Sequence, residues 1–272
     1  MKPTFKRYIK YLVIGIIAVA IAALFPRHKS QKGHPRDYAE IIKSGVLKVV
    51  TEYNSLSYFV DGDTLSGFHY DLIRAFAHDK GLELEITPEM SFEKRMEGLE
   101  NGKYDIIAYS ILVTSELKDS ILLTNPIILN KQILIQRKVN EADSTYIPNQ
   151  LELARKTLYV VKGSPSILRI RNLGNEIGDT IYINEIEKYG PEQLIAMVAH
   201  GDIDYAVCDE SIAVALIDSF PQLDIKTDIS FTQFHSWGVS KQSPVLLDSL
   251  NAWLDTFTKG KDYQRIYRKY YK

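Results

Sequence analysis

The segment GDIDYAVCDES, residues 201–211, ends an apolar run on two adjacent carboxylates, Asp209 and Glu210. Ile203, Tyr205 and Val207 alternate with Asp204, Ala206 and Cys208. This pattern is typical of a short strand that is largely covered by other elements. An acidic pair at the end of a strand could be a general acid, a metal ligand, a binding group for an ammonium ion or the N-cap of a following helix. Which of these four roles applies depends on the strands and helices that surround the pair.

A second candidate is the turn KGSPS, residues 162–166. Ser164 stands where an N-cap belongs, before Pro165 at the first helical position. A helix N-terminus that carries hydroxyl groups can bind an anion, although Pro165 removes one backbone donor from such a site. Plain capping of the helix is the alternative, and both interpretations remain open.

The composition limits the classes of partner. Charged residues make up 25% and hydrophobic residues 45% of the 272 residues, and the formal net charge is −1. These are ordinary globular values, and such a balance creates no field that would attract nucleic acid, so we exclude it as a partner. The one cysteine, Cys208, excludes an intramolecular disulfide and a cysteine-rich metal site, and we expect it to be a packed thiol. We predict no metal and no cofactor.

An apolar segment at residues 11–25 follows the basic start MKPTFKRYIK. Counted from Tyr8, with Lys10 reaching the interface, residues 8–25 approach the roughly 20 residues that a spanning helix needs. A cleaved signal peptide, with Ala20-Ile21-Ala22 as its small-residue site, is the alternative. We favour an uncleaved inner-membrane anchor, so that residues 1–36 form a cytoplasmic tail, the anchor and a tether to a periplasmic domain. Basic residues flank the apolar segment on both sides, so the distribution of positive charge does not determine its orientation in the membrane.

Strands and helices alternate with short connections after residue 37, and the same pattern restarts near residue 157. This order predicts two α/β units with largely parallel sheets. The expected strands lie at 46–53, 82–88, 104–111, 157–161, 180–186 and 202–209. The expected helices lie at 38–43, 68–81, 91–102, 166–170 and onward, 190–201 and 210–220, with two amphipathic helices within 243–271.

Six motifs resemble, in order and spacing, the type-3 family of bacterial extracellular solute-binding proteins. They are GVLKV (45–49), GFHYDL (67–72), LENGKYDII (99–107), TSELKDSILLTNP (114–126), VVKGS (160–164) and GDIDYAVCD (201–209). The resemblance covers nearly all residues from 38 onward. The region from 201 to about 253 is similar in particular to the end of the solute-binding module of membrane-bound lytic murein transglycosylase F, which continues into a lysozyme-like catalytic domain.

The resemblance implies an α/β fold with two lobes, the type 2 periplasmic-binding-protein or Venus-flytrap architecture, preceded here by a membrane helix. Lobe 1 would comprise residues 37–136 plus 230–272, and lobe 2 residues 137–229. Ligand would bind between the lobes, outside the carboxyl ends of the strands, and hinge motion would close them.

The resemblance also implies roles for single residues. Asp209 would take the ligand's α-ammonium, with helix capping as the alternative, and the turn at Ser164 would take its carboxylate. Asp71 matches the family pattern within GFHYDL, where we favour a structural role. Other ligand contacts are implied at the end of one strand and in the aromatic loop after the first strand, with core or lid packing as the alternative for each: Tyr109, Ser110, Leu112, Tyr53, Tyr58 and Phe59.

One departure from the family concerns the ligand. Leu117 stands where the family's amino-acid binders carry the arginine that clamps the ligand's α-carboxylate. Leucine cannot make this bidentate contact, and the neighbouring Lys118 is expected to point elsewhere. A buried carboxylate without a partner is costly. We therefore expect a small amine-bearing ligand such as a peptide or muropeptide fragment rather than a free amino acid.

The leading hypothesis is a membrane-tethered binding protein of the cell envelope without catalysis of its own. A lytic transglycosylase that cleaves peptidoglycan, or its regulatory module, is the first alternative. Glu210 followed by Ser211 would be its acid, but a glycosidase also needs a second carboxylate or substrate assistance. The binding component of an ABC amino-acid transporter is the second alternative. A small ligand, the membrane, and a permease or cell-wall enzyme are the expected partners.

Overall fold

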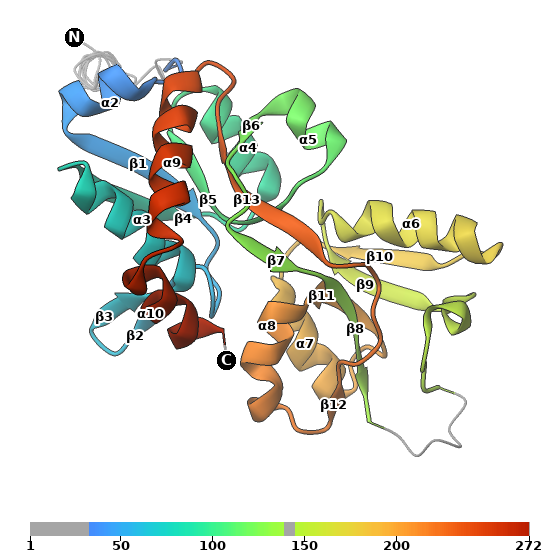
Figure 1. Ribbon diagram of the computed structural model, residues 1–272. Helices are drawn as coiled ribbons and strands as arrows, with labels where there is room; N and C mark the ends of the chain where they lie inside the picture. Colours follow the sequence, from blue (N-terminus) through green and yellow to red (C-terminus); the bar gives the residue numbers. More distant parts are fainter. Residues whose placement is uncertain (1–32, 139–144, 272) are drawn as a thin grey trace, which may run out of the picture. The chain divides into compact units, whose positions relative to one another are not determined.

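The alternating strands and helices form two α/β lobes, each built on its own sheet (Figure 1). The computed structural model describes residues 33–138 and 145–271. The predicted membrane anchor at residues 8–25 lies outside this range and stays a prediction. Within the described range, no helix has the length and apolar character that crossing a bilayer requires.

The sheet of lobe 1 has the strand order β4-β1-β5-β13-β6, with β7 paired to β13. β1 runs parallel to β4 and β5, as predicted, whereas β13 is antiparallel to β5. A separate hairpin joins β2 and β3. The strands of lobe 1 are β1 (Val46–Thr51), β2 (Phe59–Asp61), β3 (Thr64–Ser66), β4 (Glu83–Pro88), β5 (Ile106–Leu112), β6 (Leu122–Leu123), β7 (Ile128–Asn130) and β13 (Gln233–Val239).

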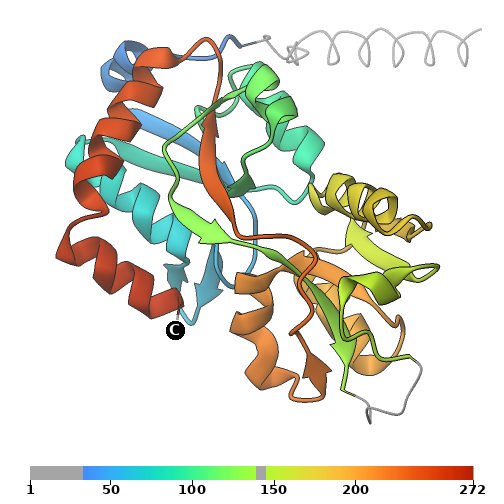
Figure 2. The ribbon, with the colours of Figure 1, turned by 45° about the vertical axis from the view of Figure 1, so that its right-hand side comes forward.

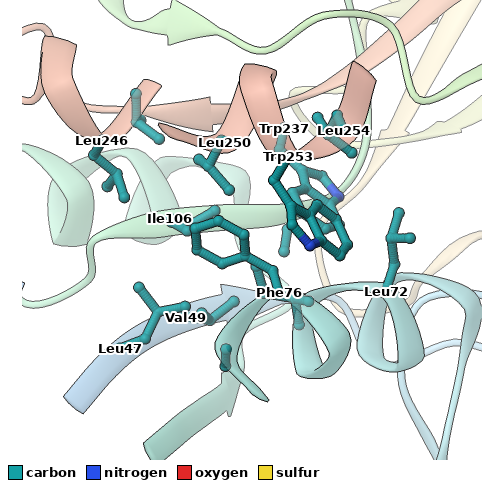
Figure 3. Close-up of a cluster of buried hydrophobic side chains, with 14 of the residues drawn as sticks. Leu47, Val49, Leu72, Phe76, Ile106, Trp237, Leu246, Leu250, Trp253 and Leu254 are labelled. Carbon is teal, nitrogen blue, oxygen red and sulfur yellow. The ribbon is translucent and has the colours of Figure 1, made fainter. Parts of the chain in front are cut away.

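The helices of lobe 1 cover both faces of this sheet because successive side chains of a strand point to opposite faces. Ile106 and Ala108 of β5 join one apolar cluster, whereas Ile107 and Ile111 join another. Figure 3 shows the first cluster, in which Trp237 packs with residues of α3 and α9. The helices are α2 (Tyr38–Ser44), α3 (Phe68–Asp79), α4 (Phe92–Glu100), α5 (Ser115–Ser120), α9 (Pro244–Phe257) and α10 (Lys261–Tyr270).

The sheet of lobe 2 has the order β10-β9-β11-β8-β12. Alternation again separates two apolar clusters: Ala206 and Cys208 of β11 face one of them, and Val207 faces the other. The strands are β8 (Gln132–Arg137), β9 (Thr157–Val161), β10 (Tyr182–Ile186), β11 (Ala206–Asp209) and β12 (Leu223–Asp224). The helices are α6 (Ser166–Ile177), α7 (Pro191–His200) and α8 (Glu210–Leu216), with 3-10 turns η1 (Gln150–Leu153) and η2 (Ile217–Ser219).

The chain crosses between the lobes twice, from β7 to β8 and from β12 to β13, and the two crossing segments lie side by side in Figures 1 and 2. β8 pairs with β11 in the second sheet, so residues 132–136 belong to lobe 2 and not to lobe 1, where the sequence-based division had put them. The boundary moves because the apolar run 133–135 is buried against lobe 2 and not against lobe 1.

Candidate ligand-binding cleft between the lobes

A cleft lies between the lobes, at the ends of β1, β5, β9 and β11, and side chains from both lobes line it. It comprises about 960 Å³, including space continuous with solvent. This position matches the general rule that open α/β sheets bind ligands outside the carboxyl ends of their strands. Six of the predicted site residues line it: Tyr109, Ser110, Leu112, Leu117, Ser164 and Asp209.

Asp209 is the last residue of β11 and is partly buried in the cleft wall. It precedes helix α8, yet its side chain makes no capping hydrogen bond. Within residues 33–138 and 145–271, no hydrogen bond or ion pair to the Asp209 carboxylate is found. Burial raises the pKa of Asp209, the nearby Glu52 raises it further, and His235 lowers it. The carboxylate is thus an acceptor that favours a cation as its partner.

Gln132 lies directly opposite Asp209 in the antiparallel pair of β8 and β11. Directly opposite residues of two strands point to the same face of the sheet, and both residues line the cleft. The Gln132 side chain is 3% exposed, and its Oε1 atom has no hydrogen-bond donor in the described residues. Asp209 and Gln132 therefore present two acceptors side by side.

Arg95 of α4 supplies a buried cation on the lobe 1 side. Its Nη2 lies 2.7 Å from Oε1 of Glu52, and its Nη1 donates to the carbonyl groups of Glu89 and Met90 at 2.6 and 3.1 Å. The guanidinium also lies over the Tyr109 ring, 4.4 Å from its centre. Burial raises the pKa of Tyr109 to about 12, so the phenol stays neutral. Glu52 neutralises Arg95, and the pair adds no net charge to the cleft.

His69 of α3 faces the same cleft and is held in one tautomer. The indole Nε1–H of the buried Trp237 donates to Nδ1 of His69 at 3.0 Å, which leaves the hydrogen on Nε2. Burial lowers the pKa of His69 to about 3, with a smaller effect from His235. His69 is therefore a neutral donor at physiological pH, and its Nε2 has no acceptor among the described residues.

The lowered pKa of His69 predicts a measurable dependence of stability on pH. The unfolded chain binds a proton at this histidine below about pH 6.5 and the folded chain does not. The stability that His69 contributes is therefore complete above pH 6.5 and is lost progressively as the pH falls toward about 3. Compared with His69→Gln, the wild type should lose about 2 kcal/mol more between pH 7 and pH 5. Urea unfolding at both pH values measures this difference, and equal losses in the two proteins would contradict it.

The two predicted anion-binding positions differ in the structure. Ser164 lines the cleft, but its hydroxyl is 2.6 Å from that of Ser166 and accepts from the Ser166 N–H at 3.3 Å. α6 begins at Ser166, with Pro165 at its N-cap position and no side-chain capping bond, so the Ser164 hydroxyl bonds within the turn that precedes the helix. Leu117 of α5 lines the cleft as an apolar contact, and Lys118 is exposed to solvent. No cation in the described residues stands in for the missing arginine at this position.

The aromatic side chains of the loop after β1 do not line the cleft, contrary to the expectation for Tyr53, Tyr58 and Phe59, although other residues of the loop (Glu52, Asn54, Leu56 and Ser57) do. A bridge between Asn54 and Tyr58 turns this loop. Tyr53 is 47% exposed and contacts Tyr58 edge to face, and Phe59 packs against a tyrosine of α10. Tyr58 also contacts Tyr70 of α3 edge to face, so Tyr58 and Phe59 pack within lobe 1.

Asp71 also lies outside the cleft lining. Its carboxylate accepts from the Tyr270 hydroxyl at 2.7 Å and from Lys269 and Arg74 at 3.2 and 3.1 Å. These bonds fasten α10 to α3, which agrees with the structural role favoured from the sequence.

Sequence reasoning missed Glu52, His69, Arg95, Gln132, His235 and Tyr271, all of which line the cleft. Gln132 and His235 carried a usable signal, since each is a polar residue at or within an apolar run. His235 lies 2.8 Å through Nδ1 from the hydroxyl of Ser110, which keeps these two side chains together in the cleft wall.

Glu210, the second carboxylate of the GDIDYAVCDES segment, is the first residue of α8 and does not line the cleft. Lys131, between β7 and β8, lies 3.3 Å from Glu210 and 2.8 Å from Asp228. The two acids thus separate: Asp209 faces the cleft, and Glu210 pairs with a lysine of the first crossing. Cys208 is a buried free thiol, as predicted.

The sequence matches one family over most of its length. Residues 47–272 match the model for bacterial extracellular solute-binding proteins, family 3. The chain is 27% identical over its whole length to a membrane-bound lytic murein transglycosylase F from Desulfosudis oleivorans, of which it covers 58%. It is 29% identical, over 87% of its length, to the protein of the same name from Photobacterium profundum, of which it covers 45%. The chain therefore spans about half the length of the curated relatives it matches.

Solved structures share the fold. A mutant of ArgBP from T. maritima superposes with a TM-score of 0.73 at 23% identity, over 86% of this chain and 98% of that one. An ancestral arginine-binding protein bound to arginine gives a TM-score of 0.73 at 25% identity, over 84% of this chain and 99% of that one. These neighbours support the two-lobed architecture.

Proposed function

The chain belongs to family 3 of the bacterial extracellular solute-binding proteins, and from this premise we propose that it captures a small amine-bearing ligand between its lobes. The family match agrees with the prediction of a solute-binding chain rather than an enzyme. The solved relative with 25% identity was bound to arginine, itself an amine-bearing small molecule. Asp209 would hold the amino group of the ligand.

The unpaired carboxylate of Asp209 is the observation that carries this proposal. A partly buried carboxylate is normally paired with a cation or bonded to several donors. Within the described residues Asp209 has neither, and its capping bond is absent. A ligand ammonium would supply a charge-assisted bond, which is among the strongest hydrogen bonds available. The neighbouring Oε1 of Gln132 would accept a second N–H of the same group.

Hinge closure would complete the site, and contacts across the cleft support it. The backbone N–H of Ser55, in the loop after β1, donates to Oε1 of Glu192 at 2.7 Å, and Glu192 lies in the first turn of α7 in lobe 2. Leu56 of the same loop packs into the apolar cluster of lobe 2. These contacts would hold the lobes together around a bound ligand.

Removing the Glu192 contact should shift the lobes toward the open state. A hydrogen bond to a charged group contributes about 1.5–3 kcal/mol, so Glu192→Ala should weaken ligand affinity by roughly 10-fold or more. Calorimetric titration measures the affinity, and small-angle scattering should show a larger radius of gyration. Glu152→Ala, an exposed glutamate of the same lobe, is the control. Unchanged affinity and radius in Glu192→Ala would refute the closing role.

The setting of this function is also a proposal. We place the chain in the cell envelope, tethered to the inner membrane through residues 8–25, with a peptide, muropeptide or amino-acid-like molecule as ligand. The transglycosylase relatives favour a cell-wall role, in sensing or handover. Binding for an ABC permease is the second candidate, favoured by the arginine-bound relative.

A thermal-shift panel of amino acids, di- and tripeptides and muropeptides tests the function. A ligand at 100 times its dissociation constant adds about 2.7 kcal/mol to stability, enough to detect. At least one amine-bearing probe should stabilise the wild type and not Asp209→Asn. If no amine stabilises the wild type, or if Asp209→Asn responds equally, the proposal fails.

A further inference from the structure

Buried polar atoms without partners gather at the cleft. Five buried side-chain polar atoms in the described residues lack a hydrogen-bond partner, and three belong to residues that line the cleft. These three are Nε2 of His69, Nε of Arg95 and Oε1 of Gln132, on side chains of residues that are 1%, 2% and 3% exposed. Buried polar groups in proteins are almost always hydrogen-bonded, so their gathering at one site indicates that a ligand completes them.

The three atoms differ in their hydrogen-bonding sense. Gln132 offers an acceptor on the lobe 2 side, next to Asp209. His69 and Arg95 offer donors on the lobe 1 side. The donor sense of His69 is fixed, because Trp237 already donates to the other ring nitrogen. Lobe 2 thus suits an amino group, and lobe 1 suits an oxygen atom of the same ligand.

The charges of the cleft indicate which kind of oxygen this is. The cationic side chains among the described lining residues are Arg95 and Lys162. Arg95 is neutralised by Glu52 at 2.7 Å, and Lys162 is an exposed residue that lies 3.3 Å from Glu187. His69 is neutral. A ligand carboxylate here would lose its hydration without gaining a free cation, and a buried charge without compensation is costly. An uncharged oxygen meets the same donors without that cost.

We propose that the cleft selects amines whose amino group is followed by an uncharged oxygen acceptor, as in an amino-acid amide or the N-terminus of a peptide, and that His69 donates to this oxygen. The inference rests on the proposed capture of an amine by Asp209. The hydrogen bond from Trp237 fixes the tautomer of His69. The imidazole therefore presents to the cleft an uncharged N–H donor of fixed direction. The apolar Leu117 in the same wall fits an amide better than a carboxylate.

Matched ligands test the inference on the unaltered full chain. Three of the ligands share the leucine side chain and differ only in the group beside the amine. L-leucine carries a carboxylate there, L-leucinamide carries an amide, and isopentylamine carries no acceptor. L-alanine, L-alaninamide, ethylamine and L-alanyl-L-alanine extend the comparison. By calorimetric titration, each amide and the dipeptide should bind at least 10-fold more tightly than the free amino acid and the simple amine. If a free amino acid binds as tightly as its amide, this inference is wrong while amine capture stands. If no amine binds at all, amine capture fails and the inference fails with it.

A variant tests the part assigned to His69. His69→Phe should lower the affinity for L-leucinamide at least 10-fold and leave that for isopentylamine unchanged, because only the oxygen contact is lost. His69→Gln, which restores an N–H donor, should recover part of the affinity. His78→Phe, at an exposed histidine of the same helix, is the control. Unchanged amide affinity in a folded His69→Phe would overturn the assignment, and if that variant does not fold, the ligand comparison on the wild type decides.

Discussion

Replacing Asp209 by asparagine is expected to lower the affinity for any amine ligand by roughly 30-fold or more. Truncating one partner of a buried, hydrogen-bonded charge pair typically costs about 2–5 kcal/mol, and asparagine keeps the shape of the side chain while removing its charge. The free protein should not be destabilised, since the carboxylate has no partner to lose among the described residues. Calorimetric titration and thermal unfolding of the same samples measure the two effects. Asp202→Asn, at an exposed acid seven residues earlier, is the control.

The raised pKa of Asp209 fixes the direction of the pH effects. Amine binding requires the ionised carboxylate, so affinity should fall as the pH drops through a pKa that lies above the ordinary carboxyl value. The contribution of Asp209 to the stability of the free protein should depend on pH in the opposite direction. A folded-state pKa above that of the unfolded chain means that the folded state holds the proton more tightly, so stability decreases as the pH rises from the unfolded pKa through the folded one. Asp209→Asn should remove both effects, and their persistence in that variant would contradict the role of Asp209.

Replacing Arg95 by methionine is expected to destabilise the fold by about 3–5 kcal/mol, because removing one partner of a buried ion pair leaves the other uncompensated. Glu52 would lose its cationic partner, and the carbonyl groups of Glu89 and Met90 would each lose a donor. The ring of Tyr109 would lose the cation over its face. For a chain of this size the melting temperature should fall by roughly 10 °C, which differential scanning calorimetry measures.

A second substitution separates the ion pair from the loss of packing. In Arg95→Met combined with Glu52→Met, no charge remains unpaired, and apolar replacement of a buried ion pair is often close to neutral. The double variant should therefore be more stable than Arg95→Met alone. Additive losses in the double variant, or a loss below 1 kcal/mol in Arg95→Met, would show that the pair is not a determinant of the fold.

Much of the fold was predictable because its signals are local. The helix at 91–102 was expected from a serine N-cap, and Ser91 accepts from the Lys94 N–H at 3.3 Å in α4. The parallel strands of lobe 1 follow from alternating apolar residues between helices. The strands β7, β8 and β13 were not predicted. β8 and the second part of β13 are buried on both faces, so neither shows a clear alternation, and their pairing is decided by residues 71 to 107 positions away.

The candidate site was predictable only where the family resemblance or a strand end pointed to it, as at Asp209. Arg95 looks like an ordinary charge on an amphipathic helix, and its burial depends on Glu52, 43 residues earlier. His69 looks like an ordinary polar residue within GFHYDL, and its tautomer depends on Trp237, 168 residues later. The sequence contains no local sign of either contact. Conversely, Tyr53 and Phe59 looked like ligand-stacking residues, but the turn and hairpin that place them against lobe 1 depend on tertiary packing.

A crystal structure of the chain with the tightest-binding amine of the ligand panel tests directly whether Asp209 holds the amino group of the ligand. We predict that the ligand's amino nitrogen lies within about 3 Å of an Asp209 carboxylate oxygen, the spacing of a charge-assisted hydrogen bond. The lobes should be closed around it, with Glu192 bonded to the Ser55 N–H. A ligand that lies in the cleft with its nitrogen away from Asp209, or that binds outside the cleft, would contradict the account.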